Sequence, residues 1–250
     1  MKKLLLLCLL LIGSSSVSFA QNYGANKNYD IDSTLYYYDS KGKIFEEGEI
    51  VTLLNEPCIV LRNNKGQDGL VMSLNWRPAT KEKGKICATI IYNPALGGAF
   101  SNKNPLNKLK LNNADFGINN LMRIYSILDT SIDYNIEDLH AFNTIDKMGN
   151  GWYIPAKNEL NLFFNAFGIN SADEKKQILN KVNSKRVEAG LQPIKKLQLY
   201  SSTETDYAGF WDVKYWAIDH KHPYLIERTI YLDKVGDPCV VPVHLVKAVE

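Results

Sequence analysis

Residues 151–160, with the sequence GWYIPAKNEL, constrain the fold more than any other part of the chain. Trp152 and Ile154 alternate with Tyr153, which is the pattern of a short, half-buried strand. Pro155 cannot continue a sheet ladder, and its fixed φ suits the first turn of a helix. The sequence therefore predicts a strand that turns sharply into a helix, with Trp152 largely buried.

The helix that follows is predicted by the spacing of its apolar residues. These are Leu160, Phe163, Phe164 and Phe167, which form the stripe of an amphipathic helix facing a core. Gly168 comes next, where the end of a helix favours a residue that can take a positive φ. We therefore expect a helix within residues 156–167.

Residues 1–20 have the features of a secretory signal peptide. Two lysines precede the apolar run at 4–12, and Ser18 and Ala20 place small residues at the −3 and −1 positions. The run is too short to span a bilayer. We expect cleavage before Gln21 and export to the periplasm, the cell surface or the medium.

The charge and the length of the mature chain limit its partners and its number of domains. The leader holds two of the 29 basic residues, which leaves 27 against 27 acidic residues. A neutral chain has no general attraction to phosphate backbones, so we expect no nucleic-acid partner. No second long apolar run occurs, so we expect no transmembrane segment. We expect an N-terminal arm at 21–44 and one domain at 45–250.

The order of the predicted elements indicates the fold class. Runs that favour strands lie at 35–38, 49–54, 58–62, 69–74, 86–92, 210–219, 225–232 and 240–249. Residues 94–113 are expected to form a long loop. Helical patterns follow Asp115, cover 136–142, and run from a cap at Asn170 or Ser171 to about Glu188. Helices in the middle and strands at both ends predict an α+β domain whose terminal strands pair.

Two later stretches complete a family resemblance. Residues 199–204 read LYSSTE, and residues 210–216 read FWDVKYW. With 151–160 they resemble the C-type-lectin-like domains of secreted bacterial proteins, the group containing the fibrobacter succinogenes major paralogous domain and the Lcl C-terminal-like domain. Residues 69–76 are similar to an early strand of that family, and residues 115–120 to a helix start. The closing strand would be 239–249, without the arginines typical of the family.

The resemblance implies a C-type-lectin-like fold with paired terminal strands and central helices. It carries over neither activity known in that superfamily. Formylglycine-generating enzymes use two reactive cysteines near the C-terminus, and only Cys239 lies there. Calcium-dependent lectins use strings such as Glu-Pro-Asn and Trp-Asn-Asp, of which Trp211 and Asp212 form only a fragment. We therefore expect no catalytic residues, no cofactor and no metal.

Three groups of residues could nevertheless carry chemistry. His220 and His222 could hold a metal from one face of a strand, but Pro223 beside them favours an exposed hairpin tip. The serines of residues 201–204 could supply a nucleophile, but without a Gly-x-Ser-x-Gly elbow we expect their hydroxyls to hydrogen-bond the loop around residues 151–160. Glu159 could be an acid–base group, or it could interact with the amide donors of its own helix start, which we favour.

Three cysteines remain after removal of the leader: Cys58, Cys87 and Cys239. An odd number allows at most one disulfide, and the sequence does not determine whether any two of them pair. Cys58 and Cys239 precede apolar β-prone runs, so we interpret both as small apolar residues in strands.

The segment from residue 204 to residue 211 is the best surface candidate, because it combines aromatic rings with carboxylates. We expect a loop here and a ligand-binding face that includes Glu204, Asp206, Tyr207 and Trp211. The predicted function is non-catalytic binding of a glycan or an envelope protein, as an adhesin or a surface-assembly component. The alternatives are an enzyme distantly related to the formylglycine-generating group, or a structural envelope subunit joined through residues 36–38.

Overall fold

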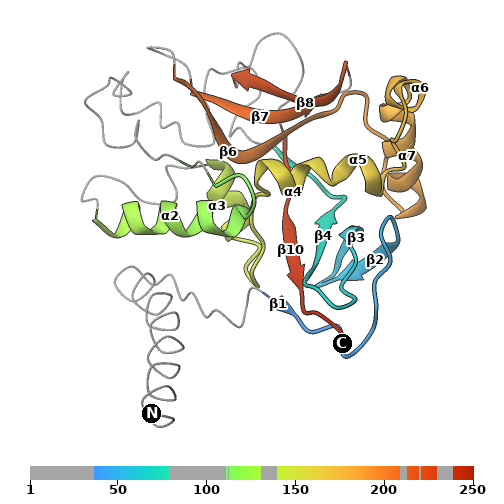
Figure 1. Ribbon diagram of the computed structural model, residues 1–250, viewed down its shortest axis with the longest axis horizontal. Helices are drawn as coiled ribbons and strands as arrows, with labels where there is room; N and C mark the ends of the chain where they lie inside the picture. Colours follow the sequence, from blue (N-terminus) through green and yellow to red (C-terminus); the bar gives the residue numbers. More distant parts are fainter. Residues whose placement is uncertain are drawn as a thin grey trace, which may run out of the picture.

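The computed structural model describes residues 37–78, 111, 113–130, 140–208, 213–219, 221–229 and 239–250. Within these residues the chain forms an α+β domain with two sheets (Figure 1). The first sheet contains, in spatial order, β1 (Tyr37–Tyr38), β10 (Val243–Val246), β4 (Gly69–Ser73), β3 (Glu56–Arg62) and β2 (Ile50–Leu53). The second contains β5 (Arg77–Pro78), β9 (Cys239–Val240), β6 (Gln198–Ala208), β7 (Val213–Asp219) and β8 (His222–Thr229). The predicted fold class is confirmed at this level.

The two ends of the described chain meet in the first sheet. β1 runs parallel to β10 with Tyr37 opposite Leu245, and β10 pairs antiparallel with β4. The buried Asn64 amide donates to the carbonyl oxygens of Lys43 at 3.0 Å and Lys247 at 3.2 Å. The predicted pairing of terminal strands is confirmed, and Tyr37 and Tyr38, from the arm expected at 21–44, take part in it.

The helices are α2 (Gly117–Thr130), α3 (His140–Asp146), α4 (Lys157–Asn161), α5 (Phe163–Ala166), α6 (Ala172–Lys176) and α7 (Ile178–Glu188). Figure 1 shows α4 and α5 between the two sheets, with α2 and α3 on one side and α6 and α7 on the other. The short helices α4 and α5 therefore lie where both sheets can bury their apolar faces.

Residues 151–160, which we call the central stretch, cross this interior. Trp152 is 3% exposed, and Tyr153 and Ile154 are fully buried, so the predicted burial of Trp152 is confirmed. The predicted half-buried strand is wrong, because all three side chains are enclosed. Only Tyr153 forms a bridge, exchanging backbone hydrogen bonds of 3.0 and 2.8 Å with Val243. The helix begins at Lys157 rather than at Pro155.

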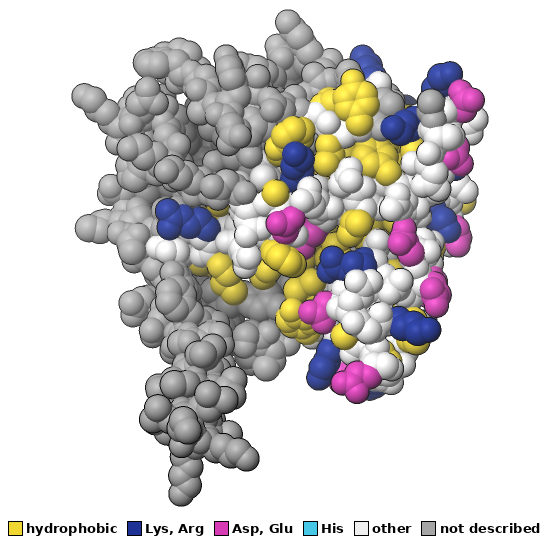
Figure 2. Space-filling model, in the orientation of Figure 1, with side chains coloured by type: hydrophobic (Ala, Val, Ile, Leu, Met, Phe, Trp, Pro, Cys, Tyr) yellow, Lys and Arg dark blue, Asp and Glu magenta, His cyan; other side chains and the backbone are white. Residues whose placement is uncertain are grey.

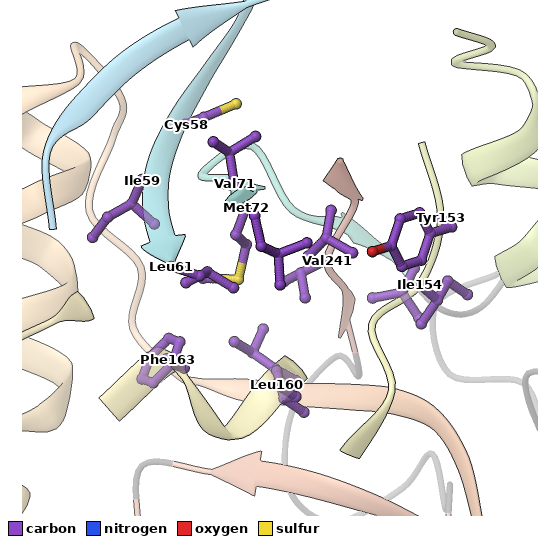
Figure 3. Packing of buried hydrophobic residues seen from close by; sticks show 14 of the residues in the cluster. Cys58, Ile59, Leu61, Val71, Met72, Tyr153, Ile154, Leu160, Phe163 and Val241 are labelled. Atoms are coloured by element: carbon purple, nitrogen blue, oxygen red, sulfur yellow. The ribbon is translucent and has the colours of Figure 1, made fainter. Parts of the chain in front are cut away.

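The predicted amphipathic stripe packs against the first sheet. Figure 3 shows Leu160 and Phe163 beneath Leu61 and Met72, and all four side chains are fully buried. The helix is divided at Leu162, which is both the C-cap of α4 and the N-cap of α5. Each large apolar side chain removed from water contributes about 1.5–3 kcal/mol, so this layer is a major part of the core.

Two predicted helix starts have different outcomes. Ser171 caps α6 as expected, and its hydroxyl accepts from the amide of Glu174, whose carboxylate returns to the Ser171 amide. Beyond it, the predicted single helix is two helices, divided at Gln177. Asp115 does not cap α2. The carboxylate of Asp115 accepts from the Asn158 side chain instead, and the side-chain oxygen of Asn113 accepts from the amides of Asp115 and Phe116, which precede the helix. The first amide of α2, that of Gly117, donates to Glu159.

The remaining strand predictions are partly tested. β2, β3 and β4 lie where three strands were expected, and β7, β8, β9 and β10 lie within or beside the last three runs. Residues 86–92, and most of the loop predicted at 94–113, lie outside the described residues. In the described part of the chain, no helix is long and apolar enough to cross a membrane.

Candidate functional site

The predicted binding loop is wrong as a description of the backbone. Glu204, Asp206 and Tyr207 lie in β6, and Glu204 pairs with Tyr215 of β7. Trp211 lies outside the described residues. The sequence suggested a loop because the polar residues of this segment do not alternate with apolar ones. In the fold the segment is nevertheless a strand, because its backbone pairs with that of β7.

β6 is irregular where the loop was expected. From Tyr200 to Glu204 it advances four residues while β7 advances two, from Ala217 to Tyr215. The same mismatch recurs from Glu204 to Ala208. Surplus residues in one strand bend it and redirect its side chains, and such bulges are common beside binding and active sites. Asp206 and Tyr207 therefore lie in an irregular ladder rather than in a free loop.

The first of these irregularities has a structural cause. The Ser202 amide donates to the carbonyl oxygen of Pro155 at 2.7 Å, and the Ser202 hydroxyl donates to the same oxygen at 3.2 Å. The Thr203 hydroxyl accepts from the Lys157 amide at 2.9 Å and donates to the carbonyl oxygen of Asn113 at 2.8 Å. β6 therefore turns its polar groups toward the central stretch instead of β7.

Asn120 of α2 joins this arrangement. Its amide nitrogen donates to the Ser202 hydroxyl at 2.9 Å and to the carbonyl oxygen of Asn113 at 3.0 Å. Asn120 is 1% exposed and Ser202 is fully buried. The prediction that these hydroxyls hydrogen-bond the loop around residues 151–160 is confirmed for Ser202 and Thr203, whereas the Ser201 hydroxyl bonds Thr203 within β6. The hydroxyl of Ser202 is enclosed by the fold.

The carboxyl group of Glu159 is also enclosed, since the residue is 2% exposed. One of its oxygens accepts from the amides of Ala156 and Gly117, both at 2.8 Å, and the other accepts from the Tyr153 hydroxyl at 2.8 Å. Burial raises the pKa of Glu159, while these three hydrogen bonds oppose the rise. The expectation that Glu159 interacts with the amide donors of its helix start is confirmed.

Gly117 allows this contact. A Cβ atom at this position would lie 2.2 Å from the carbonyl oxygen of Ile154 and 2.7 Å from the amide nitrogen of Ala156. α2 therefore begins directly against the backbone of the central stretch. We call the set of buried residues that join α2, the central stretch and β6 the polar junction: Gly117, Asn120, Pro155, Glu159, Ser202 and Thr203.

The surface beside the polar junction has a different character. The Lys157 ammonium lies 3.6 Å from the centre of the Trp216 ring, a cation–π contact between α4 and β7. Both side chains are partly exposed. Figure 2 shows hydrophobic side chains gathered in the upper part of the described surface, with Lys and Arg among them. Lys157 occupies the first turn of a helix, where the helix dipole disfavours a positive charge. The cation–π contact with Trp216 offsets this unfavourable interaction by stabilising the ammonium group.

The next residue extends this surface toward α2. The Asn158 side-chain amide donates to the carboxylate of Asp115 at 2.7 Å, and both side chains are exposed. Phe116, the residue after Asp115, is 48% exposed. We call this set the surface strip: Asp115, Phe116, Lys157, Asn158 and Trp216. It offers two aromatic rings, a cation, a carboxylate and an amide on segments anchored by the polar junction.

Sequence reasoning missed the surface strip. Its residues come from three separate segments, and only their contacts in the fold join them. One signal was available, because Lys157 stands at a helix start where the helix dipole disfavours a positive charge. That signal predicts a special partner for the ammonium without identifying Trp216.

The candidate metal and thiol residues carry no site in the described residues. His220 lies outside them, and the exposed Lys221 marks the turn before β8 (from His222). No three His, Cys, Asp or Glu residues converge within the described ranges. Cys58 is fully buried, and burial raises the pKa of its thiol; Cys58 and Cys239 are not joined to each other.

His244 has a structural role in the core. It is 1% exposed and packs edge-on against Trp152, with ring centres 5.1 Å apart. Its two ring nitrogens face the carbonyl oxygens of Leu245 and Asn150. Burial lowers the pKa of His244, and the two carbonyl contacts oppose that shift.

Comparisons of the chain with protein-family models, with curated proteins and with solved structures give no match. The polar junction and the surface strip are therefore the features of this chain from which its function can be inferred.

Proposed function

We propose that the protein is an exported, non-catalytic binding module of the cell envelope, with a glycan or an envelope protein as its ligand. The observation that carries this proposal is the surface strip. Partly exposed aromatic rings beside hydrogen-bonding side chains are the composition of recognition surfaces. Phe116 and Trp216 lie on a helix start and a strand, so little order has to be gained on binding.

The polar junction supports a non-catalytic role. Ser202 and Glu159 are the residues in this region with the clearest catalytic potential, and both are enclosed by the fold. Every hydrogen bond described above for Ser202 joins it to Pro155 or Asn120, and those of Glu159 join it to the backbone and Tyr153. A nucleophile or general base has to reach its substrate, whereas these groups hold the chain together.

The same junction supports a C-type-lectin-like fold as the finer description. Three motifs of that resemblance, at residues 115–120, 151–160 and 199–204, contact one another through Gly117, Asn120 and Ser202. Motifs from distant segments that meet at one buried point hold those segments together. A fold shared by a family would require such motifs.

The proposed contact face also includes the distal part of β6 and the predicted residue Trp211. Glu204 pairs with Tyr215, the residue before Trp216, so the backbone of distal β6 lies beside the surface strip. The predicted contact residues Glu204, Asp206 and Tyr207 belong to this part of β6.

The proposal is tested by screening the mature protein, residues 21–250, on a glycan array and in pull-downs from envelope extracts. The Asp206→Ala, Tyr207→Ala double variant should weaken binding of the ligand found by about 2 kcal/mol or more, with an unchanged melting temperature. Asp173→Ala is the matched control, because Asp173 is exposed on α6. A protein that retains no glycan and no partner contradicts the proposal.

Export has its own test. N-terminal sequencing of the protein recovered from outside the cytoplasm should begin at Gln21. An unprocessed chain that stays in the cytoplasm would contradict the envelope location without affecting the argument for binding.

A further inference from the structure

Three lysines gather at one end of the second sheet. Lys195 and Lys196 lie just before β6, and Lys221 lies in the turn between β7 and β8. The strand register brings them together, because β6 begins with Gln198 opposite Asp219, two residues before Lys221. Figure 1 shows the start of β6 and the turn between β7 and β8 at the same end of the sheet, beside α6. We call Lys195, Lys196 and Lys221 the lysine cluster.

The two segments that carry the lysine cluster are fixed by polar side chains. The Asn183 side chain of α7 donates to the carbonyl oxygen of Ile194 at 2.9 Å and accepts from the Ile194 amide at 2.8 Å, directly before Lys195. The buried Asp219 carboxylate accepts from the Lys221 amide at 2.7 Å. The backbone of both segments is therefore held in place, while all three lysine residues are exposed.

The positive charge of the lysine cluster is not balanced by its described neighbours. None of its three ammonium groups forms an ion pair with a residue that the structure describes. α6, which lies beside β8, holds two acidic and two basic side chains and so adds no net charge. The Asp219 carboxylate is buried and is engaged by the backbone of the turn. The exposed charge at this end of the sheet is therefore positive, although the mature chain is expected to be neutral overall.

The residue types favour a membrane surface over a protein partner. Protein–protein interfaces are enriched in Arg and depleted of Lys, and the segments at 192–197 and 220–222 contain lysine but no arginine. Lysine acts as a point charge on a flexible stem, which suits the diffuse negative potential of an anionic bilayer. Tyr224, three residues after Lys221, is 55% exposed, and tyrosine rings are common at the level of lipid headgroups.

We infer that the lysine cluster and Tyr224 form a surface that attaches the protein reversibly to an anionic lipid bilayer. The ammonium groups lie against lipid phosphates, and the Tyr224 ring enters the headgroup layer. Each lysine strengthens partitioning by about fivefold, so the three together contribute about a hundredfold. The inference does not depend on the binding function proposed above, because it uses no residue of the surface strip.

The test is sedimentation of the purified mature protein with lipid vesicles. One set contains phosphatidylcholine alone, and the other contains phosphatidylcholine and phosphatidylglycerol in equal parts. We expect partitioning into the anionic vesicles to be stronger by about tenfold or more at low salt. High salt should remove this preference, because it screens the attraction between lysine and lipid phosphate.

The Lys195→Gln, Lys196→Gln, Lys221→Gln triple variant connects the attachment to the lysine cluster. It should reduce partitioning into the anionic vesicles by about a hundredfold, because all three ammonium groups are lost. Its melting temperature should be unchanged, since the three side chains are exposed and make no ion pair with the described residues.

The matched control is the Lys65→Gln, Lys147→Gln, Lys247→Gln triple variant. These lysines are also exposed and lie in segments outside the lysine cluster, so the control removes the same net charge from other parts of the surface. It should weaken partitioning by less than about threefold. Tyr224→Ala keeps all the lysines and should weaken partitioning by about threefold wherever binding is measurable, because the apolar contribution is not screened by salt.

The other results would overturn the inference. Equal partitioning into the two kinds of vesicle would exclude attraction to anionic lipid. Equal effects of the two triple variants would show a dependence on net charge alone. An acidic envelope protein that is captured in pull-downs through the lysine cluster, without partitioning into anionic vesicles, would replace the membrane by a protein partner. None of these results affects the surface strip, whose ligand is measured separately.

Discussion

The polar junction and the surface strip are made of similar residues but have opposite roles. Asn158 and Glu159 are adjacent in the sequence, yet Asn158 is exposed while Glu159 is 2% exposed and accepts three hydrogen bonds. The same comparison applies between β6 and β7, where Ser202 is enclosed and Trp216 is partly exposed. Residue type alone therefore does not separate structural groups from binding groups. What separates them is the direction in which each side chain points, into the fold or toward solvent.

The comparison predicts that substitutions in the polar junction reduce stability, whereas those in the surface strip reduce binding. The largest effect is expected for Gly117→Ala. The added Cβ would overlap the carbonyl oxygen of Ile154, so α2 and the central stretch must separate. We expect a loss of about 3 kcal/mol or more in the free energy of unfolding, measured by urea denaturation.

Gly149→Ala is the control for that measurement. Gly149 has φ 64°, and a Cβ there meets no atom within 4 Å, so only backbone strain remains. Its cost should be about 1–2 kcal/mol. Equal losses in the two variants would show that close contact with the central stretch does not determine the start of α2.

The next effect concerns Glu159→Gln, which keeps the size of the side chain. One of the two acceptor oxygens becomes an NH₂ group that faces a donor, either the backbone amides or the Tyr153 hydroxyl. We expect a loss of about 2–3 kcal/mol in unfolding free energy by urea denaturation. Glu188→Gln, in an exposed ion pair with Lys185, should cost less than about 0.5 kcal/mol.

A pH effect is expected from His244. Burial lowers the pKa of His244 below 6.5, its usual value, so the folded protein binds this proton less readily than the unfolded chain. The stability that depends on neutral His244 is therefore present above pH 6.5 and is lost as the pH falls through the pKa of the folded state. Stability measured from pH 7.5 downward should fall more steeply for the wild type than for His244→Gln.

Other groups titrate in the opposite sense, which makes the variant necessary. Burial raises the pKa values of Glu159 and Asp146, so their contributions are fully present at low pH and are lost as the pH rises through the folded pKa of each. Both groups are retained in His244→Gln. The difference between the two pH profiles therefore isolates the histidine, and identical slopes would contradict its role.

The smallest effect on stability is expected for Asn158→Ala. Its side chain is exposed, and only the hydrogen bond to Asp115 is lost. The unfolding free energy should change by less than about 0.5–1 kcal/mol, while affinity for the ligand falls measurably. A large loss of stability here would place Asn158 in the junction and remove the distinction between the two regions.

The sequence by itself determined the elements with a strong local period. The stripe from Leu160 to Phe167, the burial of Trp152 and the pairing of the terminal strands follow from apolar spacing and order. The hydrogen-bonding roles of Ser202 and Glu159 were also predictable, because no catalytic motif surrounds Ser202 and Glu159 lies in the first turn of a helix.

Only the tertiary structure decided which distant residues meet. The amide that Gly117 donates to Glu159 comes from 42 residues away, and the Asn120 amide reaches Ser202 across 82 residues. The irregular ladder of β6 has the same origin, because its polar groups bond the carbonyl oxygen of Pro155 rather than β7. The surface strip likewise exists only where α2, α4 and β7 converge. Local spacing sets the period of a segment, whereas such contacts depend on the path of the whole chain, which no single stretch of sequence specifies.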